Sequence, residues 1–281
     1  SGVYGGIDFL YDFCTGRQPR IGKKTAVIGG GNTAMDAART ALRMGAEVTV
    51  LYRRTRKDMP AEEIEIVEAE EEGIRFEFCV SPAELIGKDG RLKSIRLQNM
   101  CAIPPARPGE RSKIEPIEGA FTELELDSLI VATGQGTDLA GLEDIRTDQW
   151  GLIDVAEGTY QTSIPGVFAG GDVIDNGNKI AIQAIADAKH AAYVISHYLN
   201  GMNASYVPDY HVVRDDLTRE ELLATNTIAE SAKMEHLFPV ARSDNFREIM
   251  AGYTAEQAQY EGNNGKRSEE HTSELQSHHD L

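Results

Sequence analysis

A glycine-rich turn near the start of the chain constrains its fold more than any other feature. Residues 25–36, T-A-V-I-G-G-G-N-T-A-M-D, begin as a short apolar run, pass through three glycines and continue with helical spacing. Read as G-x-G-x-x-A, the turn places Gly29, Gly31 and Ala34 at the three positions of a dinucleotide-binding fingerprint. The first glycine permits a tight turn, the second lets backbone approach a pyrophosphate, and the third small residue lets the helix pack on the strand. We therefore expect a dinucleotide whose phosphates lie at the helix N-terminus.

The residues around this turn predict a strand–helix–strand unit. Gly45 stands where a left-handed residue would end the helix, and residues 47–52 form a second apolar strand. The alternative is a glycine-rich turn inside an α/β core that binds no ligand. The spacing of a packed helix face is followed by Ala34, Ala37, Ala38, Ala41 and Leu42.

The end of the second strand indicates which dinucleotide is preferred. An NAD-type site places an acid there for the ribose 2′-hydroxyl, whereas an NADP-type site accommodates the 2′-phosphate with arginine. Here Arg53 and Arg54 follow the strand, and no acid occupies the position. A planar guanidinium can bond two phosphate oxygens at once, so we expect NADPH rather than NADH. The alternative is a solvated basic turn.

The charge of the chain narrows the classes of partner. The 281 residues carry a formal net charge of −17. A surface of this charge repels nucleic acid and anionic membranes, so neither is expected as a partner. No apolar run approaches the roughly 18–20 residues that span a bilayer.

The cysteines indicate a reducing compartment. Cys14, Cys79 and Cys101 are the only ones, and none stands at C-x-x-C spacing. We therefore expect a cytoplasmic protein without a disulfide framework, and no iron–sulfur ligand run or redox dithiol within this stretch. The absence of an H-E-x-x-H pattern gives no support for a metal site.

A second glycine-rich segment points to a second ligand. Residues 162–172, T-S-I-P-G-V-F-A-G-G-D, are expected to form a strand that ends on glycines, followed by a helix over 180–199. Glycines let backbone approach a flat or phosphorylated ligand, and Asp172 is placed to accept hydrogen bonds from ribityl or ribose hydroxyls. The helix start near residues 182–183 would stabilise the negative charge that develops on a reduced flavin ring. The alternative is a glycine-rich strand end without flavin.

The remaining pattern predicts several further elements. Residues 61–72 form an acidic helix whose glutamates are expected to be solvated. Two capping boxes, Thr218 with Glu221 and Thr254 with Gln257, each begin a short helix. Further predictions are a helix or turn over 7–13, a hairpin over 85–97 closed by Asp89-Gly90, a proline-rich loop over 103–116, and strands within 124–133, 150–154 and 167–169.

Together these motifs resemble the two-dinucleotide-fold flavoprotein oxidoreductases. The spacing A-T-G at 132–134 followed by T-x-x-x-x-h-F-A-x-G-D at 162–172 is that of the superfamily. The resemblance covers roughly residues 1–200. It is more specifically similar to the small (β) subunit of NADPH-dependent glutamate synthase, and to the flavin part of dihydropyrimidine dehydrogenase, at residues 28–36, 52–54, 59–61 and 169–172.

The resemblance implies an α/β fold in which a Rossmann-like NAD(P)H-binding domain is inserted into an FAD-binding domain, here incomplete. It also implies that NADPH passes a hydride to FAD. Electrons then leave through iron–sulfur clusters of the longer protein to a partner subunit or domain. No side chain is needed as acid or base, because transfer between cofactors depends on their placement, so no catalytic residue is expected. The implied cofactor-binding residues are Gly29, Gly30, Gly31, Asn32, Thr33, Arg53 and Arg54 for NADPH, and Gly134, Gly171, Asp172 and Gln183 for FAD.

The chain departs from the family pattern in two places. The first FAD element, a strand with its own glycine motif, is absent, and no cysteines follow residues 246–257, which resemble a stretch leading into a cluster. Residues 267–281 are expected to be a non-native tail, because they match the translation of a sequencing-adapter oligonucleotide. We therefore expect a fragment of a longer flavoprotein. Its expected domains are 20–125 for NAD(P)H, 1–19 with 126–200 as the C-terminal part of the FAD-binding domain, and 201–266 as a helical or loop-rich appendage.

Two other functions compete with this interpretation. A thioredoxin-reductase-like enzyme would need a C-x-x-C between Gly29 and Thr133, and the sequence has none. A nucleotide-binding module would hold NADPH without catalysis, because its flavin site is incomplete. Whether the purified chain is yellow separates the module from the flavoprotein.

Overall fold

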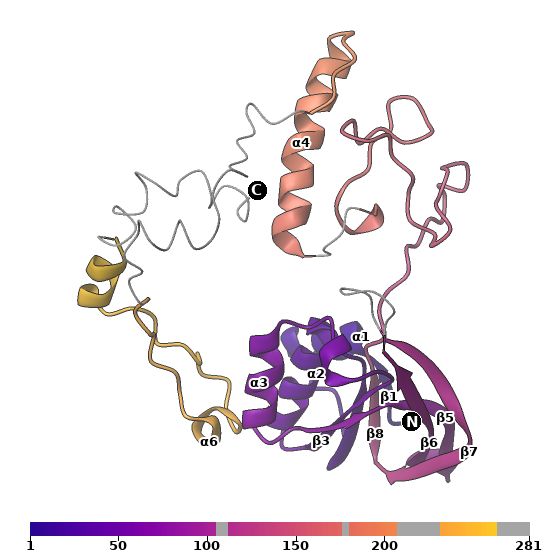
Figure 1. Cartoon of the computed structure of the whole chain (residues 1–281), viewed down its shortest axis with the longest axis vertical. Helices are drawn as coiled ribbons and strands as arrows, with labels where there is room; N and C mark the ends of the chain where they lie inside the picture. Colours follow the sequence, from indigo (N-terminus) through magenta and orange to yellow (C-terminus); the bar gives the residue numbers. More distant parts are fainter. Residues whose placement is uncertain (105–111, 176–179, 207–230, 263–281) are drawn as a thin grey trace. The chain divides into compact units, whose positions relative to one another are not determined.

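A parallel β-sheet carries the glycine turn. The computed structural model describes residues 1–104, 112–175, 180–206 and 231–262 (Figure 1). The sheet has the strand order β1-β8-β2-β3-β4, and each neighbouring pair is parallel. It confirms the predicted α/β class. Its strands are β1 (Val3–Gly5), β2 (Lys24–Ile28), β3 (Glu47–Tyr52), β4 (Arg75–Phe78) and β8 (Ser128–Val131).

Helices connect the strands as the sequence pattern predicts. α1 (Gly6–Cys14) follows β1, in agreement with the helix expected over 7–13. α2 (Asn32–Arg43) leads from β2 to β3, and α3 (Glu63–Glu71) leads from β3 to β4. Gly45 takes a φ of +93° just beyond α2, which confirms the left-handed residue expected there. The strand–helix–strand unit is therefore present at its predicted place.

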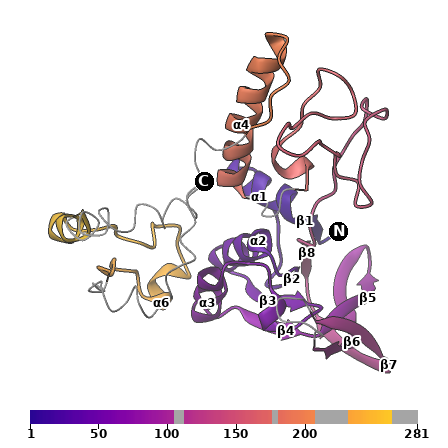
Figure 2. The ribbon, with the colours of Figure 1, turned by 45° about the horizontal axis from the view of Figure 1, so that its top comes forward.

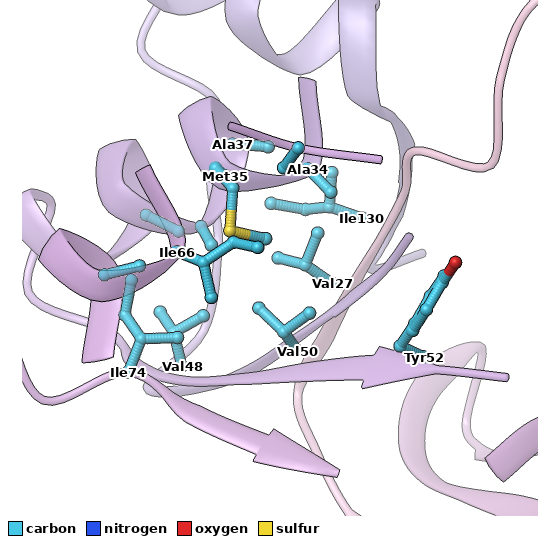
Figure 3. Packing of buried hydrophobic residues seen from close by; sticks show 14 of the residues in the cluster. Val27, Ala34, Met35, Ala37, Val48, Val50, Tyr52, Ile66, Ile74 and Ile130 are labelled. Carbon is cyan, nitrogen blue, oxygen red and sulfur yellow. The ribbon is translucent and has the colours of Figure 1, made fainter. Parts of the chain in front are cut away.

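The helical face of the sheet holds the main hydrophobic core. Val27 of β2 and Val50 of β3 are fully buried and belong to one cluster with Met35 of α2 and Ile66 of α3. Figure 3 shows these side chains gathered between the helices and the strands. Small residues on α2 let the helix approach the sheet closely, since Ala34, like Met35, has no exposed surface.

A three-stranded antiparallel sheet covers the other face. It consists of β5 (Val80–Lys88), β6 (Arg91–Ile103) and β7 (Lys113–Glu125), in that order. Figures 1 and 2 show α2 and α3 on one side of the parallel sheet and β5–β7 on the other. Because side chains alternate along a strand, the second core contains the residues between those of the first, among them Ala26, Leu51 and Leu129.

The predicted hairpin is present, whereas the predicted long loop is shorter than expected. Asp89 and Gly90 both have positive φ, +53° and +72°, as a two-residue turn between β5 and β6 requires. The loop expected over 103–116 is wrong at its end, because β7 already begins at Lys113 and pairs Pro116 with Met100. Proline is tolerated there because β7 is an edge strand with no further partner on its outer side. Residues 105–111 lie outside the described part.

The chain divides into two units, each described by itself. One comprises Ser1–Gly134 with Met234–Gly252, and the other Gln135–Lys233 with Tyr253–Leu281. The sequence assigned residues 1–19 and 126–200 to the flavin-binding domain. In the structure β1 and β8 belong to the same sheet as β2, because Ile130 pairs with both Tyr4 and Val27. The parallel ladder therefore extends across the boundary expected at residues 20 and 125.

The sequence predicted that the glutamates of the acidic helix are solvated, and this is wrong for Glu68 and Glu72. Glu68 and Glu72 are buried and lie against arginines of α2. The side chain of Glu72 is wholly inaccessible, and its two oxygens accept hydrogen bonds from Arg39 and Arg43 at 2.7–3.2 Å. Glu72 approaches Arg39 and Arg43 only when α2 and α3 pack side by side. A run of glutamates in sequence does not show which of its members meet cations.

A later segment of the chain joins this cluster. α6 (Pro239–Arg242) supplies Arg242, which is only 2% exposed and lies 2.5 Å from Glu71 and 3.2 Å from Glu72. Phe246 from the same segment packs on Phe13 of α1, with ring centroids 4.8 Å apart. Part of the expected appendage over 201–266 thus belongs to the first unit.

The second unit contains η2 (Gly171–Val173), a short 3-10 turn, and α4 (Ala181–Leu199), which confirms the helix expected over 180–199. The short strands expected at 150–154 and 167–169 are wrong. Within the described residues, Ile153 and Phe168 each form an isolated bridge, because no neighbouring segment continues the ladder. The Thr254 capping box is confirmed by reciprocal bonds with Gln257. The Thr218 box and residues 267–281 lie outside the described part.

We predict that Glu72→Gln lowers the free energy of unfolding by about 3 kcal/mol, because it leaves buried arginines without their carboxylate. Burial alone would raise the pKa of Glu72, but hydrogen bonds from Arg39 and Arg43 lower it below its usual value. The stabilisation is therefore present above the pKa of an unfolded glutamate and is lost as the pH falls through the folded-state pKa. Urea unfolding followed by circular dichroism should show the difference between the two proteins shrinking below about pH 4.

The matched control is Glu62→Gln, at an exposed position just before α3. It should change the free energy of unfolding by less than about 0.5 kcal/mol. Equal effects of the two substitutions would contradict a structural role for the buried carboxylate.

Candidate functional site

The glycine turn owes its shape to contacts that leave no room for a side chain at Gly29. This residue follows β2 with a φ of +146°, and its N–H donates to Leu51 O at 3.1 Å. A Cβ at Gly29 would lie 2.3 Å from Ala132 O and 3.1 Å from Ala34 Cβ. The first fingerprint position is therefore a meeting point of β2, α2 and the segment after β8.

Gly30 is restricted by an aromatic ring. A Cβ there would lie 2.5 Å from the ring of Tyr52, the last residue of β3. The Tyr52 hydroxyl donates to Asp58 O at 2.8 Å, and Ala61 N–H donates to Gly30 O at 3.0 Å. The turn is thus bound to the segment 58–61 that follows β3, and its conformation is fixed before any ligand arrives.

Gly31 differs from its neighbours because the space beside it is open. It is the N-cap of α2 with φ −94°, and the nearest heavy atom to a Cβ there would be Pro60 Cγ, 3.9 Å away. Packing therefore does not require glycine at this position. As the first residues of α2, Asn32 and Thr33 have backbone N–H groups without an intrahelical acceptor. An open approach beside free donors and a positive helix end suits a pyrophosphate.

Asn32 has a structural contact as well. Its Oδ1 accepts a hydrogen bond from Glu62 N–H at 2.9 Å, which holds the start of α3 beside the start of α2. Asn32 is exposed and Thr33 is partly exposed.

The two arginines after β3 have different environments. Arg53 is exposed and makes no ion pair among the residues that the structure describes. Arg54 is partly buried, and its Nε donates to Ser112 O at 3.1 Å. Arg56, in η1 (Arg56–Asp58), binds Glu63 and Glu70 of α3. Arg53 is therefore the arginine with the freest side chain for an incoming phosphate.

Asp58 holds this basic turn in place. Its carboxylate accepts hydrogen bonds from Thr55 Oγ1 at 2.6 Å and from Ser112 N–H at 2.9 Å. Burial would raise the pKa of Asp58, but the hydrogen bonds from Thr55 and Ser112 lower it to about 2. The carboxylate is therefore ionised at neutral pH. It fixes the loop from which Arg53 and Arg54 project.

The predicted nucleotide-binding residues of the first unit gather at one edge of the sheet. Ile28 of β2 pairs with Leu51 of β3, so the turn at Gly29–Gly31 and Arg53 both follow the carboxyl ends of adjacent parallel strands. Ligands of open α/β sheets bind at this edge. The glycine turn and the basic turn are thus brought together.

The predicted flavin-binding residues fall in both units. Gly134 ends the first stretch of the first unit with φ +112°, and a Cβ there would have no heavy atom within 4 Å. In the second unit, Gly171 has φ +74° within η2, and Asp172 is exposed. Gln183 lies in the first turn of α4 and donates through Nε2 to Asp187 Oδ1 at 3.0 Å.

Sequence reasoning did not identify three residues that shape these sites, namely Tyr52, Asp58 and Asp187. Asp187 left a visible signal, since it is an acid four residues after Gln183 and therefore lies one turn away on the same side of the helix. Tyr52 and Asp58 left none, because their roles depend on a ring and a carboxylate that meet backbone only in the folded chain.

The chain belongs to the pyridine nucleotide-disulphide oxidoreductase family, which matches residues 11–191. This family uses NAD(P)H and FAD, which confirms the predicted class of enzyme, the cofactor pair and the two-dinucleotide fold. The glycine turn, with its open approach at Gly31, fits a pyridine nucleotide. The turn at Gly171, a buried residue with a left-handed φ next to the exposed Asp172, fits part of a flavin cofactor.

Curated relatives agree with the expected resemblance. NADP(+)-dependent formate dehydrogenase subunit beta of Moorella thermoacetica is 41% identical over 202 residues, which are 71% of this chain and 28% of that protein. NADPH-Fe(3+) oxidoreductase subunit beta of Geobacter sulfurreducens is 34% identical over 287 residues, 90% of this chain and 42% of that protein. The NADPH glutamate synthase small chain of Escherichia coli is 34% identical over 63% of this chain and 39% of that protein. The chain thus spans less than half of each relative.

Solved structures with a similar fold are thioredoxin reductases. That of Lactococcus lactis has a TM-score of 0.54 at 25% identity and covers 72% of this chain and 59% of its own. That of T. acidophilum has the same TM-score at 21% identity and covers 70% and 57%. The likeness concerns the fold, since the three cysteines of this chain do not form the C-x-x-C dithiol.

We predict that Gly31→Ala weakens NADPH binding without affecting folding, whereas Gly29→Ala destabilises the fold. Gly31→Ala should leave the free energy of unfolding within about 0.5 kcal/mol of wild type, since its Cβ meets nothing. It should weaken NADPH binding by roughly tenfold or more, because the methyl group occupies the approach of the pyrophosphate. Calorimetric titration and urea unfolding measure the two effects.

Gly29→Ala is the counterpart, because its Cβ would overlap Ala132 O. It should lower the free energy of unfolding by more than about 2 kcal/mol. Unchanged NADPH affinity in Gly31→Ala would contradict the assignment of the turn.

We also predict that Arg53→Gln with Arg54→Gln reduces the affinity for NADPH by roughly ten- to hundredfold and that for NADH by less than about threefold. The reason is that only NADPH carries the 2′-phosphate. Lys57→Gln, which removes a charge from an exposed residue of the same turn, is the control. Equal losses for the two nucleotides would contradict the 2′-phosphate contact.

Proposed function

We propose that this chain is the NADPH-accepting part of an electron-input flavoprotein of the glutamate synthase small-subunit type. In the longer protein a hydride passes from NADPH to FAD, and electrons then pass to an iron–sulfur partner subunit or domain. The observation that carries the proposal is the open approach at Gly31, beside the free N–H groups of Asn32 and Thr33. The other glycines of the turn are required by packing, whereas this one is explained by a ligand.

The choice of NADPH rests on the basic turn. Arg53 is exposed at the end of β3, where an NAD-type site would carry an acid. Asp58 and Ser112 hold the loop, so little order is left to impose when a phosphate binds. The names of the relatives cited above also contain NADP or NADPH.

The proposed flavin contacts of the second unit are those of Gly171, Asp172 and Gln183. Bound FAD would supply the acceptor for the hydride. The exposed carboxylate of Asp172 would accept hydrogen bonds from ribityl hydroxyls, and the start of α4 would face developing negative charge. No side chain of the chain is assigned as acid or base, because orientation and exclusion of water carry the reaction.

The names of the relatives support a partner, and the cysteines support a location. The relatives are named as subunits or chains, which supports an electron-accepting partner for the longer protein. The three cysteines are free, in keeping with a reducing, cytoplasmic setting. Within the described residues, no helix combines the length and apolar character needed to cross a bilayer.

A second candidate function is an NADPH-binding module that catalyses nothing on its own. The observation favouring it is that the chain spans only 28–42% of the three relatives cited. In this case the nucleotide site works alone and the flavin site is completed by other residues.

The experiment that separates these functions is a visible spectrum of the purified chain mixed with FAD, before and after anaerobic NADPH. Flavin that remains bound through gel filtration and bleaches on addition of NADPH supports the electron-input function. NADPH binding without retained flavin supports the module. Retained flavin that neither NADPH nor NADH reduces would contradict the proposed hydride transfer.

A further inference from the structure

A buried carboxylate lies behind the glycine turn of the second unit. Asp187 is in the second turn of α4 and is only 1% exposed. A carboxylate buried at this depth requires compensating hydrogen-bond donors. None of the roles assigned above uses Asp187.

Donors from three places converge on this carboxylate. The backbone N–H of Gly171 donates to Oδ2 at 2.8 Å. Gln183 Nε2 donates to Oδ1 at 3.0 Å, and the hydroxyl of Tyr160 donates to the same oxygen at 3.3 Å. Hydrogen bonds to an ionised acceptor are stronger than those between neutral groups. The carboxylate therefore ties the glycine turn to α4 and to the loop that contains Tyr160.

The packing around Gly171 leaves the turn little freedom. A Cβ at Gly170 would lie 3.2 Å from Asp187 Cβ, so backbone and side chain are already close. Gly171 holds a φ of +74°, a conformation that its bond to Asp187 helps to fix. Asp172, the next residue, is exposed. The direction in which it presents its carboxylate depends on this turn.

Tyr160, one of the donors to Asp187, belongs to a cluster of rings with His190 and Tyr206. The Tyr160 hydroxyl lies 3.2 Å from His190 Nδ1, and the His190 ring stacks on Tyr206 with centroids 3.7 Å apart. Burial and the negative charge of Asp187 raise the pKa of Tyr160 to about 12. Tyr160 therefore stays protonated and keeps donating over the whole physiological pH range.

We propose that Asp187 is a positioning residue that fixes the Gly170–Asp172 turn in the form that receives the hydroxyl-bearing chain of a flavin cofactor. It acts through Gly171 and Gln183 and does not itself contact the cofactor. The inference rests on the proposed flavin site, but the hold of Asp187 on the turn is measurable without any flavin. Preordering of this kind increases affinity because less conformational freedom is lost on binding.

The test uses the full chain with Asp187→Asn, which keeps the shape of the side chain and removes its charge. Amide hydrogen exchange in the cofactor-free protein should be faster at Gly171 by roughly tenfold or more. Exchange at Thr162, whose N–H bonds to Val167 O, should not change. The dissociation constant of FAD should rise roughly ten- to hundredfold, while that of NADPH stays as in wild type.

Two further variants serve as a control and as a second probe of the hydrogen bonds around Asp187. Asp154→Asn makes the same chemical change at an exposed position of the same unit, and it should alter neither exchange nor FAD binding. Tyr160→Phe removes one donor and keeps the carboxylate. It should weaken FAD binding by a smaller factor and should report on the network if Asp187→Asn does not fold.

The outcomes separate this inference from the proposed function. If wild type binds FAD and Asp187→Asn binds it equally tightly with unchanged exchange at Gly171, the positioning role is overturned and the function stands. If wild type binds NADPH but no FAD, the proposed flavin site of this chain fails, and exchange at Gly171 alone decides whether Asp187 fixes the turn.

Discussion

The first unit depends on the close approach of backbone at Gly29. A side chain there would overlap the carbonyl of Ala132, so β2, α2 and the segment after β8 can meet only around a glycine. Ala34 continues this requirement on the helix, where it has no exposed surface. The neighbouring Gly30 lies against the Tyr52 ring, which in turn holds Asp58. The geometry that we propose for binding a pyrophosphate is therefore also the geometry that closes the core.

The sequence predicted the parts of the fold that have a local cause. The strand–helix–strand unit, the Asp89-Gly90 hairpin and α4 follow from periodicity and turn chemistry over a few residues. The predicted strands at 150–154 and 167–169 lack a ladder, since strand formation depends on a partner that local pattern does not show. The glycine turn and the basic turn lie where glycine spacing and strand ends predicted them, and their use as a nucleotide site stays a prediction. The sequence prediction missed residues such as Tyr52 and Asp187, whose contacts form only in the folded chain.

The buried carboxylates are another feature that the local sequence pattern does not predict. A run of glutamates is usually a solvated face, yet Glu72 is inaccessible because arginines of α2 and α6 surround it. Asp187 is buried in the second unit because Gly171, Gln183 and Tyr160 donate to it. Both carboxylates connect segments that are distant in sequence, and removing either leaves donors unpaired. In a chain of net charge −17, such acids are structural parts of the fold, while Arg53 remains exposed.

We propose that NADPH binds at the carboxyl edge of β2 and β3. A titration of the isotope-labelled chain with NADPH, followed by amide chemical shifts, tests it directly. We expect the largest shifts at Gly29–Thr33 and at Arg53 and Arg54, with smaller shifts at the same residues for NADH at equal concentration. Shifts confined to other parts of the chain, or none at saturating NADPH, would contradict the claim.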